Sequence, residues 1–242
     1  MLGRRGANRW PTQTVGGGEW AAAAEPVPDM EWLRSPAATL ARETLQQGLL
    51  FPAARFVARP EVVGAGDLEH APQPAVLAAN HSSDLDTPLI LGALPREWRS
   101  RTLVGAAADR FYRRRRYALP TAFFIGTFPF DRSGDGRGLA RAATLMGEGW
   151  NLLLYPQATR SQGVLGGFRS GVARLCVTAQ VPAIPVHVGG TALLMPKGRG
   201  LSQRGMSRVA FGRPLMPGDE EPAEFGERLS AAIADLALPP AR

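Results

Sequence analysis

Residues 75–91 have the sequence AVLAANHSSDLDTPLIL, and this stretch decides the fold. Its first part, AVLAA, is a continuous apolar run, which is typical of a short strand buried on both faces. The polar segment NHSSD at residues 80–84 then predicts a turn. Residues 87–94 are again mostly apolar and predict a short helix. We therefore expect polar side chains to be held in a loop where a buried strand ends.

Short strands and helices alternate on both sides of this segment. The alternation predicts one α/β domain over residues 58–242, with helices flanking a central sheet that is mostly parallel or mixed. Residues 1–28 are rich in Gly, Ala, Pro and Arg without apolar periodicity, so we expect a disordered tail. The expected strands are residues 56–63, 75–79, 101–106, 150–155, 183–188 and 207–211, and the expected helices are residues 87–94, 109–127, 138–147, 168–179 and 222–236.

Residues 29–57 form the N-terminal segment of the pattern and predict an amphipathic helix. Leu40, Leu45, Leu49 and Leu50 recur among polar residues, and Pro52 is expected to end or kink the helix. Such a helix packs on the core or lies in a membrane interface. Packing of the leucines on the core is the simpler interpretation.

Composition excludes several classes of protein. With 45% apolar and 20% charged residues, the chain can bury a core, which excludes a wholly disordered or fibrous protein. The single cysteine, Cys176, excludes an internal disulfide and favours a reducing compartment. Three histidines in 242 residues argue against a metal site. No segment predicts a membrane span or a secretory signal, so we expect a cytoplasmic protein, peripheral on the inner face of the membrane.

The charge is strongly basic and unevenly distributed. Lys and Arg number 28 against 21 Asp and Glu, and no carboxylate occurs between Glu148 and Asp219. This imbalance indicates an anionic partner near that stretch. The four arginines at residues 113–116 could contact nucleic acid, but no recognition motif accompanies them, so we expect no nucleic-acid partner.

His81 and Asp86 are the first candidates for chemistry. A carboxylate five residues after a histidine can fold back within one turn and accept the Nδ1 proton, which leaves Nε2 able to act as a base. No serine or cysteine is forced to be the nucleophile, so His81 would deprotonate a substrate hydroxyl. Taken alone, the segment equally allows a histidine that only stabilises the turn.

Three further segments strengthen the first interpretation. They are FPFDR at residues 128–132, YPQATRS at residues 155–161 and VPAIP at residues 181–185. With the His-x4-Asp block before them, they give the chain a resemblance to the glycerophospholipid acyltransferase family, of the bacterial 1-acyl-glycerol-3-phosphate acyltransferase type. The resemblance extends over about residues 56–215. Each block alone is a weak match, whereas four in the same order are specific.

The resemblance implies an activity. The family transfers a fatty acyl group from a thioester of coenzyme A or acyl carrier protein to a hydroxyl of a lysophospholipid or glycerol phosphate. It implies that 1-acyl-glycerol-3-phosphate becomes phosphatidic acid, with no cofactor beyond the acyl donor. His81 would be the general base, Asp86 would orient it, and no acyl-enzyme would form.

The resemblance also implies the residues that bind the acceptor. Arg132 and Arg160 would hold its phosphate through guanidinium donors. Thr159 and Ser161 would add further donors there or help to stabilise the tetrahedral oxyanion. Gln157 belongs to the same predicted set.

Gln157 and Ala158 depart from the family, which has Glu-Gly at these positions. Gln157 keeps its hydrogen-bonding groups but has no charge. The departure leaves the acceptor open, so a phosphate-free acceptor and a non-catalytic lipid-binding relative stay as alternatives.

Overall fold

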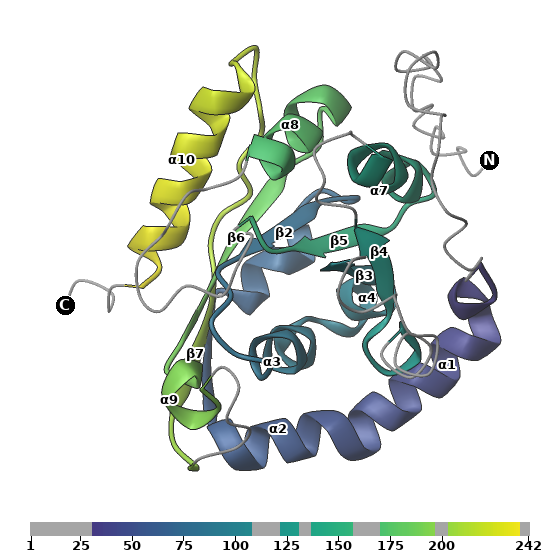
Figure 1. The fold of residues 1–242 in the computed structure, drawn as a ribbon, viewed down its shortest axis with the longest axis vertical. Coiled ribbons are helices and arrows are strands. Elements are labelled where there is room, and N and C mark those ends of the chain that lie inside the picture. The colour runs from purple at the N-terminus through teal and green to yellow at the C-terminus, as the bar shows by residue number, and fades with distance from the viewer. Residues whose placement is uncertain (1–30, 108–121, 131–136, 157–169, 197–202, 238–242) are drawn as a thin grey trace, which may run out of the picture.

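The computed structural model describes residues 31–107, 122–130, 137–156, 170–196 and 203–237. Within these residues, one mixed sheet of seven strands is flanked by helices on both faces (Figure 1). The predicted α/β class and single domain are confirmed. The predicted tail at residues 1–28 lies outside the described residues, and the boundaries at residues 28 and 57 stay predictions.

The strand order is β1-β7-β6-β2-β5-β3-β4. The strands β4, β3, β5, β2 and β6 are parallel to one another, β7 is antiparallel to β6, and β1 is parallel to β7. Every residue of the central strands β2 and β5 is buried, and all of these residues except Asn151 are apolar. The bounds are β1 Pro60–Val63, β2 Val76–Ala79, β3 Thr102–Ala107, β4 Thr127–Phe130, β5 Asn151–Leu154, β6 Ala183–Gly189 and β7 Ser207–Phe211.

The helices divide between the two faces of the sheet. The longer helices α7, α8 and α10 cover one face, and α1 to α4 lie on the other (Figure 1). Short elements connect them, namely the 3-10 helices Glu31–Arg34 and Ala65–His70 and the single turn α9. The bounds are α1 Pro36–Leu45, α2 Phe51–Ala58, α3 Asp86–Ala93, α4 Arg96–Ser100, α7 Arg137–Gly147, α8 Ser170–Ala179, α9 Thr191–Leu194 and α10 Pro222–Asp235.

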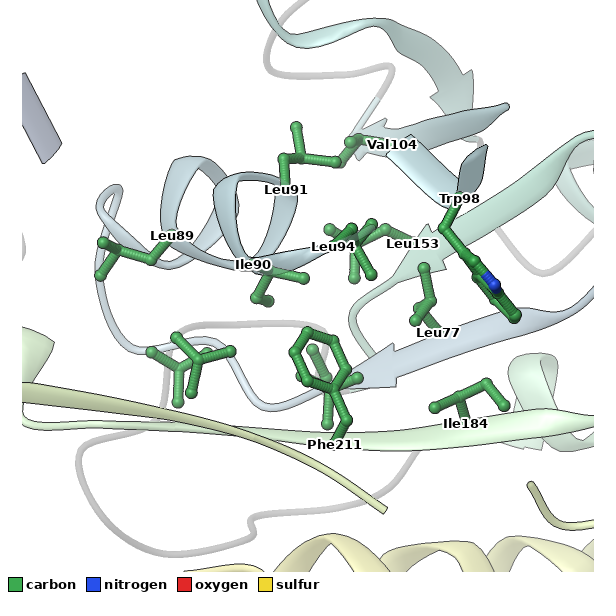
Figure 2. Close-up of a cluster of buried hydrophobic side chains, with 14 of the residues drawn as sticks. Leu77, Leu89, Ile90, Leu91, Leu94, Trp98, Val104, Leu153, Ile184 and Phe211 are labelled. Atoms are coloured by element: carbon green, nitrogen blue, oxygen red, sulfur yellow. The ribbon is translucent and has the colours of Figure 1, made fainter. Parts of the chain in front are cut away.

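The hydrophobic core between α3 and the sheet holds the start of α3 in place. Figure 2 shows Ile90 and Leu91 of α3 in one cluster with Leu77 of β2 and Leu153 of β5, and all four side chains are buried. Trp98 closes the cluster, and its indole N–H donates to the carbonyl of Leu68 at 2.8 Å. Burial of a large apolar side chain contributes about 1.5–3 kcal/mol, so α3 is firmly fixed to the sheet.

The N-terminal helix does not end at the proline. A π-helical turn, Gln46–Leu50, joins α1 to α2, and the N–H of Phe51 donates to the carbonyl of Gln46. Pro52 lacks an N–H and sits in the first turn of α2, where no such donor is required. The predicted helix end at Pro52 is therefore wrong. The predicted strand at residues 56–63 is also wrong in its first part, because residues 56–58 complete α2.

The predicted packing of the N-terminal leucines on the core is wrong for Leu40, Leu45 and Leu49, whereas Leu50 is partly buried and packs against the core. Leu40 and Leu49 are 61% and 63% exposed, and Leu45 is exposed as well. The helix instead faces the core with Arg42 and Gln46, which donate to the carbonyls of Leu33 and Phe124. Hydrogen-bonded polar side chains and mostly small apolar residues fill this inner face, so the three exposed leucines lie on the outer face. The buried apolar residues of the face are Ala38, Phe51, Ala54 and Ala58.

Most other predicted elements match the structure to within two residues. The predicted helix at residues 109–127 is described only from residue 122, and its end is wrong because Thr127 begins β4. The strand β4 and the short helices α4 and α9 are not among the elements predicted from the sequence, and the two helices are too short to show a periodicity. Among the described residues, no helix has the length and apolarity needed to cross a membrane.

Candidate active site

The candidate site lies at the carboxyl ends of three neighbouring parallel strands. In the order β6-β2-β5, each strand is followed by a side chain of the site: Thr191 after β6, His81 after β2 and Tyr155 after β5. The carboxyl ends of parallel strands share one edge of the sheet, where loops bring polar groups together. The topology thus gathers residues that are far apart in the sequence.

His81 and Asp86 form the centre of the site. The imidazole Nδ1 lies 3.0 Å from Oδ2 of Asp86, and the N–H groups of Ser82 and Ser83 donate to the same oxygen at 2.7 and 2.8 Å. Because a carboxylate oxygen can only accept, Nδ1 donates the proton of this hydrogen bond, and in the neutral imidazole Nε2 then holds the lone pair. Asp86 is fully buried, whereas the side chain of His81 is 20% exposed.

Thr191 contacts the other oxygen of the carboxylate. Its hydroxyl donates to Oδ1 of Asp86 at 2.5 Å, and its Oγ1 lies 3.1 Å from Oγ of Ser82. Thr191 is completely buried. Thr191 was not predicted as a site residue. In the sequence, the one feature that could indicate such a role is its position directly after an apolar strand and two glycines.

Tyr155 holds the imidazole from one side. Its ring stacks on His81 with the centroids 4.2 Å apart and the planes at 28°. Its hydroxyl is hydrogen-bonded to Thr87 Oγ1 at 2.6 Å, which fixes the ring relative to α3. The sequence analysis placed Tyr155 in a motif block without giving it a role.

The loop around His81 is anchored to the strand beside it. The side-chain amide of Asn80 donates to the carbonyl of Val188 at 2.8 Å and accepts from its N–H at 2.7 Å. The hydroxyl of Ser83 donates to the carbonyl of Met195 at 3.0 Å. Ser82 and Ser83 therefore use their hydroxyls to bind Thr191 and Met195, as structural groups.

The five predicted acceptor-binding residues lie outside the described part of the chain. They follow β4 and β5 in the sequence, and their roles stay predictions. These residues are Arg132, Gln157, Thr159, Arg160 and Ser161.

Two other reactive residue types lie within the fold. Cys176 is buried in α8, and burial raises the pKa of its thiol to about 12, so it is protonated and unreactive at neutral pH. Burial, and to a lesser extent the nearby Arg208, lowers the pKa of His187 in β6, which favours a neutral imidazole. In the described residues, no three His, Cys, Asp or Glu side chains gather as a metal site would require.

Comparison with known proteins gives a consistent result. A family model described as Acyltransferase matches residues 61–189, which is just over half of the 242 residues and includes both His81 and Asp86. The crystal structure of the 1-acyl-sn-glycerophosphate (LPA) acyltransferase from Thermotoga maritima superposes with a TM-score of 0.62. It covers 89% of this chain and 85% of that one, and the 23% identity supports the fold alone.

Two curated relatives are similar to this chain in sequence. A chloroplastic 1-acyl-sn-glycerol-3-phosphate acyltransferase of Brassica napus is 26% identical over 167 residues, which is 65% of this chain and 45% of that protein. An Arabidopsis thaliana protein of the same description is 27% identical over 164 residues, which is 64% of this chain and 43% of that protein. The chain thus spans about half the length of the curated relatives that it matches.

Proposed function

Because this chain belongs to the Acyltransferase family, we propose that it transfers an acyl group from a thioester to a hydroxyl, with His81 as the general base. The donor is acyl coenzyme A or acyl carrier protein. The acceptor is a lysophospholipid or glycerol phosphate, and the names of the relatives favour 1-acyl-glycerol-3-phosphate, which becomes phosphatidic acid. The observation that carries the proposal is the contact of 3.0 Å between His81 and the buried Asp86.

The mechanism follows from the protonation of this pair. Nε2 of His81 takes the proton of the acceptor hydroxyl as its oxygen attacks the thioester carbonyl carbon. The C–O bond forms, the C–S bond breaks, and the leaving thiolate takes the proton from the imidazolium. Asp86 accepts the Nδ1 proton throughout and stabilises the positive charge of the imidazolium.

A nucleophile supplied by the substrate agrees with the surroundings of His81. The two serines that follow it bind Thr191 and Met195 through their hydroxyls, and the thiol of Cys176 is buried and protonated. These contacts favour direct transfer over a covalent acyl-enzyme.

The test is product detection. The purified protein is incubated with palmitoyl coenzyme A and a panel of acceptors, and thiol release and the lipid products are followed by colorimetry and mass spectrometry. Phosphatidic acid formed from 1-acyl-glycerol-3-phosphate supports the proposal. Acylation of monoacylglycerol instead would identify a phosphate-free acceptor. Absence of thiol release with every acceptor, together with saturable lipid binding, would indicate a non-catalytic lipid binder.

Replacement of Arg160 by alanine tests whether the acceptor carries a phosphate. A charge-assisted hydrogen bond contributes about 1.5–3 kcal/mol, so the KM for a phosphate acceptor is expected to rise about tenfold or more. Arg101→Ala is the control, because this exposed arginine precedes β3 at the opposite edge of the sheet. An acceptor KM equal to that of the control would exclude Arg160 from phosphate binding.

The outward face of the N-terminal helix supports binding to a membrane surface. From residue 36 to residue 56, Arg55 is the one charged residue that is exposed, and the three exposed leucines lie in the same segment. Arg59 and Arg204 are exposed at one end of this segment, where the guanidinium of Arg204 lies 3.5 Å from the ring centroid of Phe56. An amphipathic helix with basic residues suits an anionic interface, which we place at the cytoplasmic face of a membrane.

Charge introduced on this apolar face is expected to weaken membrane binding. Because Leu49 is 63% exposed, Leu49→Glu should leave the unfolding temperature nearly unchanged while lowering partitioning onto phosphatidylglycerol vesicles about tenfold. Ala231→Glu makes the same charge change at an exposed position of α10 and serves as the control. Sedimentation with vesicles measures the partitioning of both variants. Equal partitioning of the two variants would show that the leucine face does not bind membranes.

A further inference from the structure

We propose that Thr191 is a positioning residue of the acyl-transfer site, whose hydroxyl holds the Asp86 carboxylate in the orientation that His81 requires. Thr191 is completely buried, so it acts through Asp86 and does not touch a substrate. The kinetic part of this inference rests on the proposed function. The structural part does not.

The two carboxylate oxygens of Asp86 have different partners. Oδ2 accepts from His81 and from the N–H groups of Ser82 and Ser83, all of which belong to the same loop. Within the described residues, the donor to Oδ1 is Thr191, from a different strand connection. Without Thr191, a buried charged oxygen would lose its hydrogen bond, and the carboxylate could rotate away from Nδ1.

The protons of this cluster have one consistent arrangement. Thr191 has a single hydroxyl proton, and it is donated to the carboxylate, which cannot donate in return. The contact between Ser82 and Thr191 therefore uses the proton of Ser82, with Oγ1 of Thr191 as acceptor. The result is a directed chain from Ser82 through Thr191 to Asp86, in which each hydrogen bond polarises the next.

The backbone places Thr191 through a turn that requires glycine. Gly190 has φ of 85°, and a Cβ there would lie 2.7 Å from the carbonyl oxygen of Met206. The turn at Gly190 lets the chain pass close to Met206, and α9 begins directly after it. The other end of α9 is also held, because the carbonyl of Met195 accepts from Ser83. Both ends of α9 thus contact the loop of His81 and Asp86.

Thr191→Val and Thr191→Ser form the kinetic test. Valine keeps the shape and removes the hydroxyl, so we expect kcat to fall about tenfold or more while KM for the donor and the acceptor changes less than about twofold. Serine keeps the hydroxyl and should recover most of kcat. Thr178→Val, at an exposed position of α8, is the matched control. If the valine variant does not fold, Thr191→Ala removes the same hydroxyl and carries the same expectation.

Histidine NMR gives a readout that does not depend on activity. Long-range proton–nitrogen spectra should show the Nδ1–H tautomer for His81 in the parent protein, with the signal assigned by its loss in His81→Gln. We expect Thr191→Val to mix the tautomers and Thr191→Ser to keep one. An unchanged His81 spectrum together with an unchanged kcat in Thr191→Val would overturn the inference. If the parent protein shows no acyl transfer but Thr191→Val still alters the His81 spectrum, the proposed function is overturned. The positioning of Asp86 by Thr191 is then still supported.

Discussion

His81→Ala is expected to lower kcat by about two to four orders of magnitude, which is the usual contribution of a positioned general base. The variant keeps Asp86 and Thr191 but has no group that can take the proton of the acceptor hydroxyl. KM for both substrates should change little, since the imidazole acts on the hydroxyl proton in the transition state. Steady-state thiol release and a single-turnover measurement of lipid product would show the loss.

The same variant is expected to fold. The imidazole is partly exposed, and its removal takes one of four hydrogen bonds from the Asp86 carboxylate, so the free energy of unfolding should fall by about 1 kcal/mol or less. His70→Ala is the matched control, because this exposed imidazole lies in the 3-10 helix before β2. Turnover at the control's rate in His81→Ala would remove the proposed mechanism.

The central layer of the fold could be predicted because its signals are local. The run AVLAA at residues 75–79 leaves no polar side chain for a solvated face, and the structure buries it as β2. Leu152, Leu153 and Leu154 of β5 follow the same rule, whereas the first residue of β5, Asn151, is polar and is buried with hydrogen bonds to Ala75 and Gln73. The apolar composition of such a strand is enough to predict that both of its faces are buried.

The orientation of the N-terminal helix could not be predicted in this way. Periodic leucines show that a helix has an apolar face, but they do not show whether protein or lipid covers that face. Arg42 and Gln46 have the sequence character of solvent-facing residues, yet they bind carbonyls of Leu33 and Phe124 on the inner side. Those acceptors belong to other segments of the chain, which periodicity does not reveal.

The candidate site likewise contains contacts that are local in the sequence and contacts between distant residues. The contact between His81 and Asp86 spans five residues and is set by one turn. The contact between Thr191 and Asp86 spans 105 residues, and that between Thr87 and Tyr155 spans 68. Both depend on the order β6-β2-β5, which sets neighbours that the sequence does not bring together. Residue spacing therefore predicts the pair of His81 and Asp86. The residues that hold this pair in place can be identified only when the strand order of the sheet is known.

Asp86→Asn is expected to separate the charge of the carboxylate from its shape. The three donors around Oδ2 select the amide oxygen for that position, because an NH2 group there would face the N–H groups of Ser82 and Ser83. The amide NH2 then lies toward Thr191, whose hydroxyl oxygen can accept in place of donating. The side chain thus keeps its volume and most of its hydrogen bonds, and we expect a thermal unfolding midpoint close to that of the parent.

The rate should respond far more than the stability. The amide oxygen introduced by Asp86→Asn still accepts the Nδ1 proton, but the imidazolium formed during proton transfer has lost the buried negative charge beside it. Such charges act strongly in a site shielded from water. We expect kcat to fall about a hundredfold to a thousandfold, with both KM values nearly unchanged. Asp84→Asn makes the same chemical change two residues away at an exposed position and should have little effect. Equal kcat values for the two variants would show that Asp86 has only a structural role, since its hydrogen bonds would then suffice without its charge.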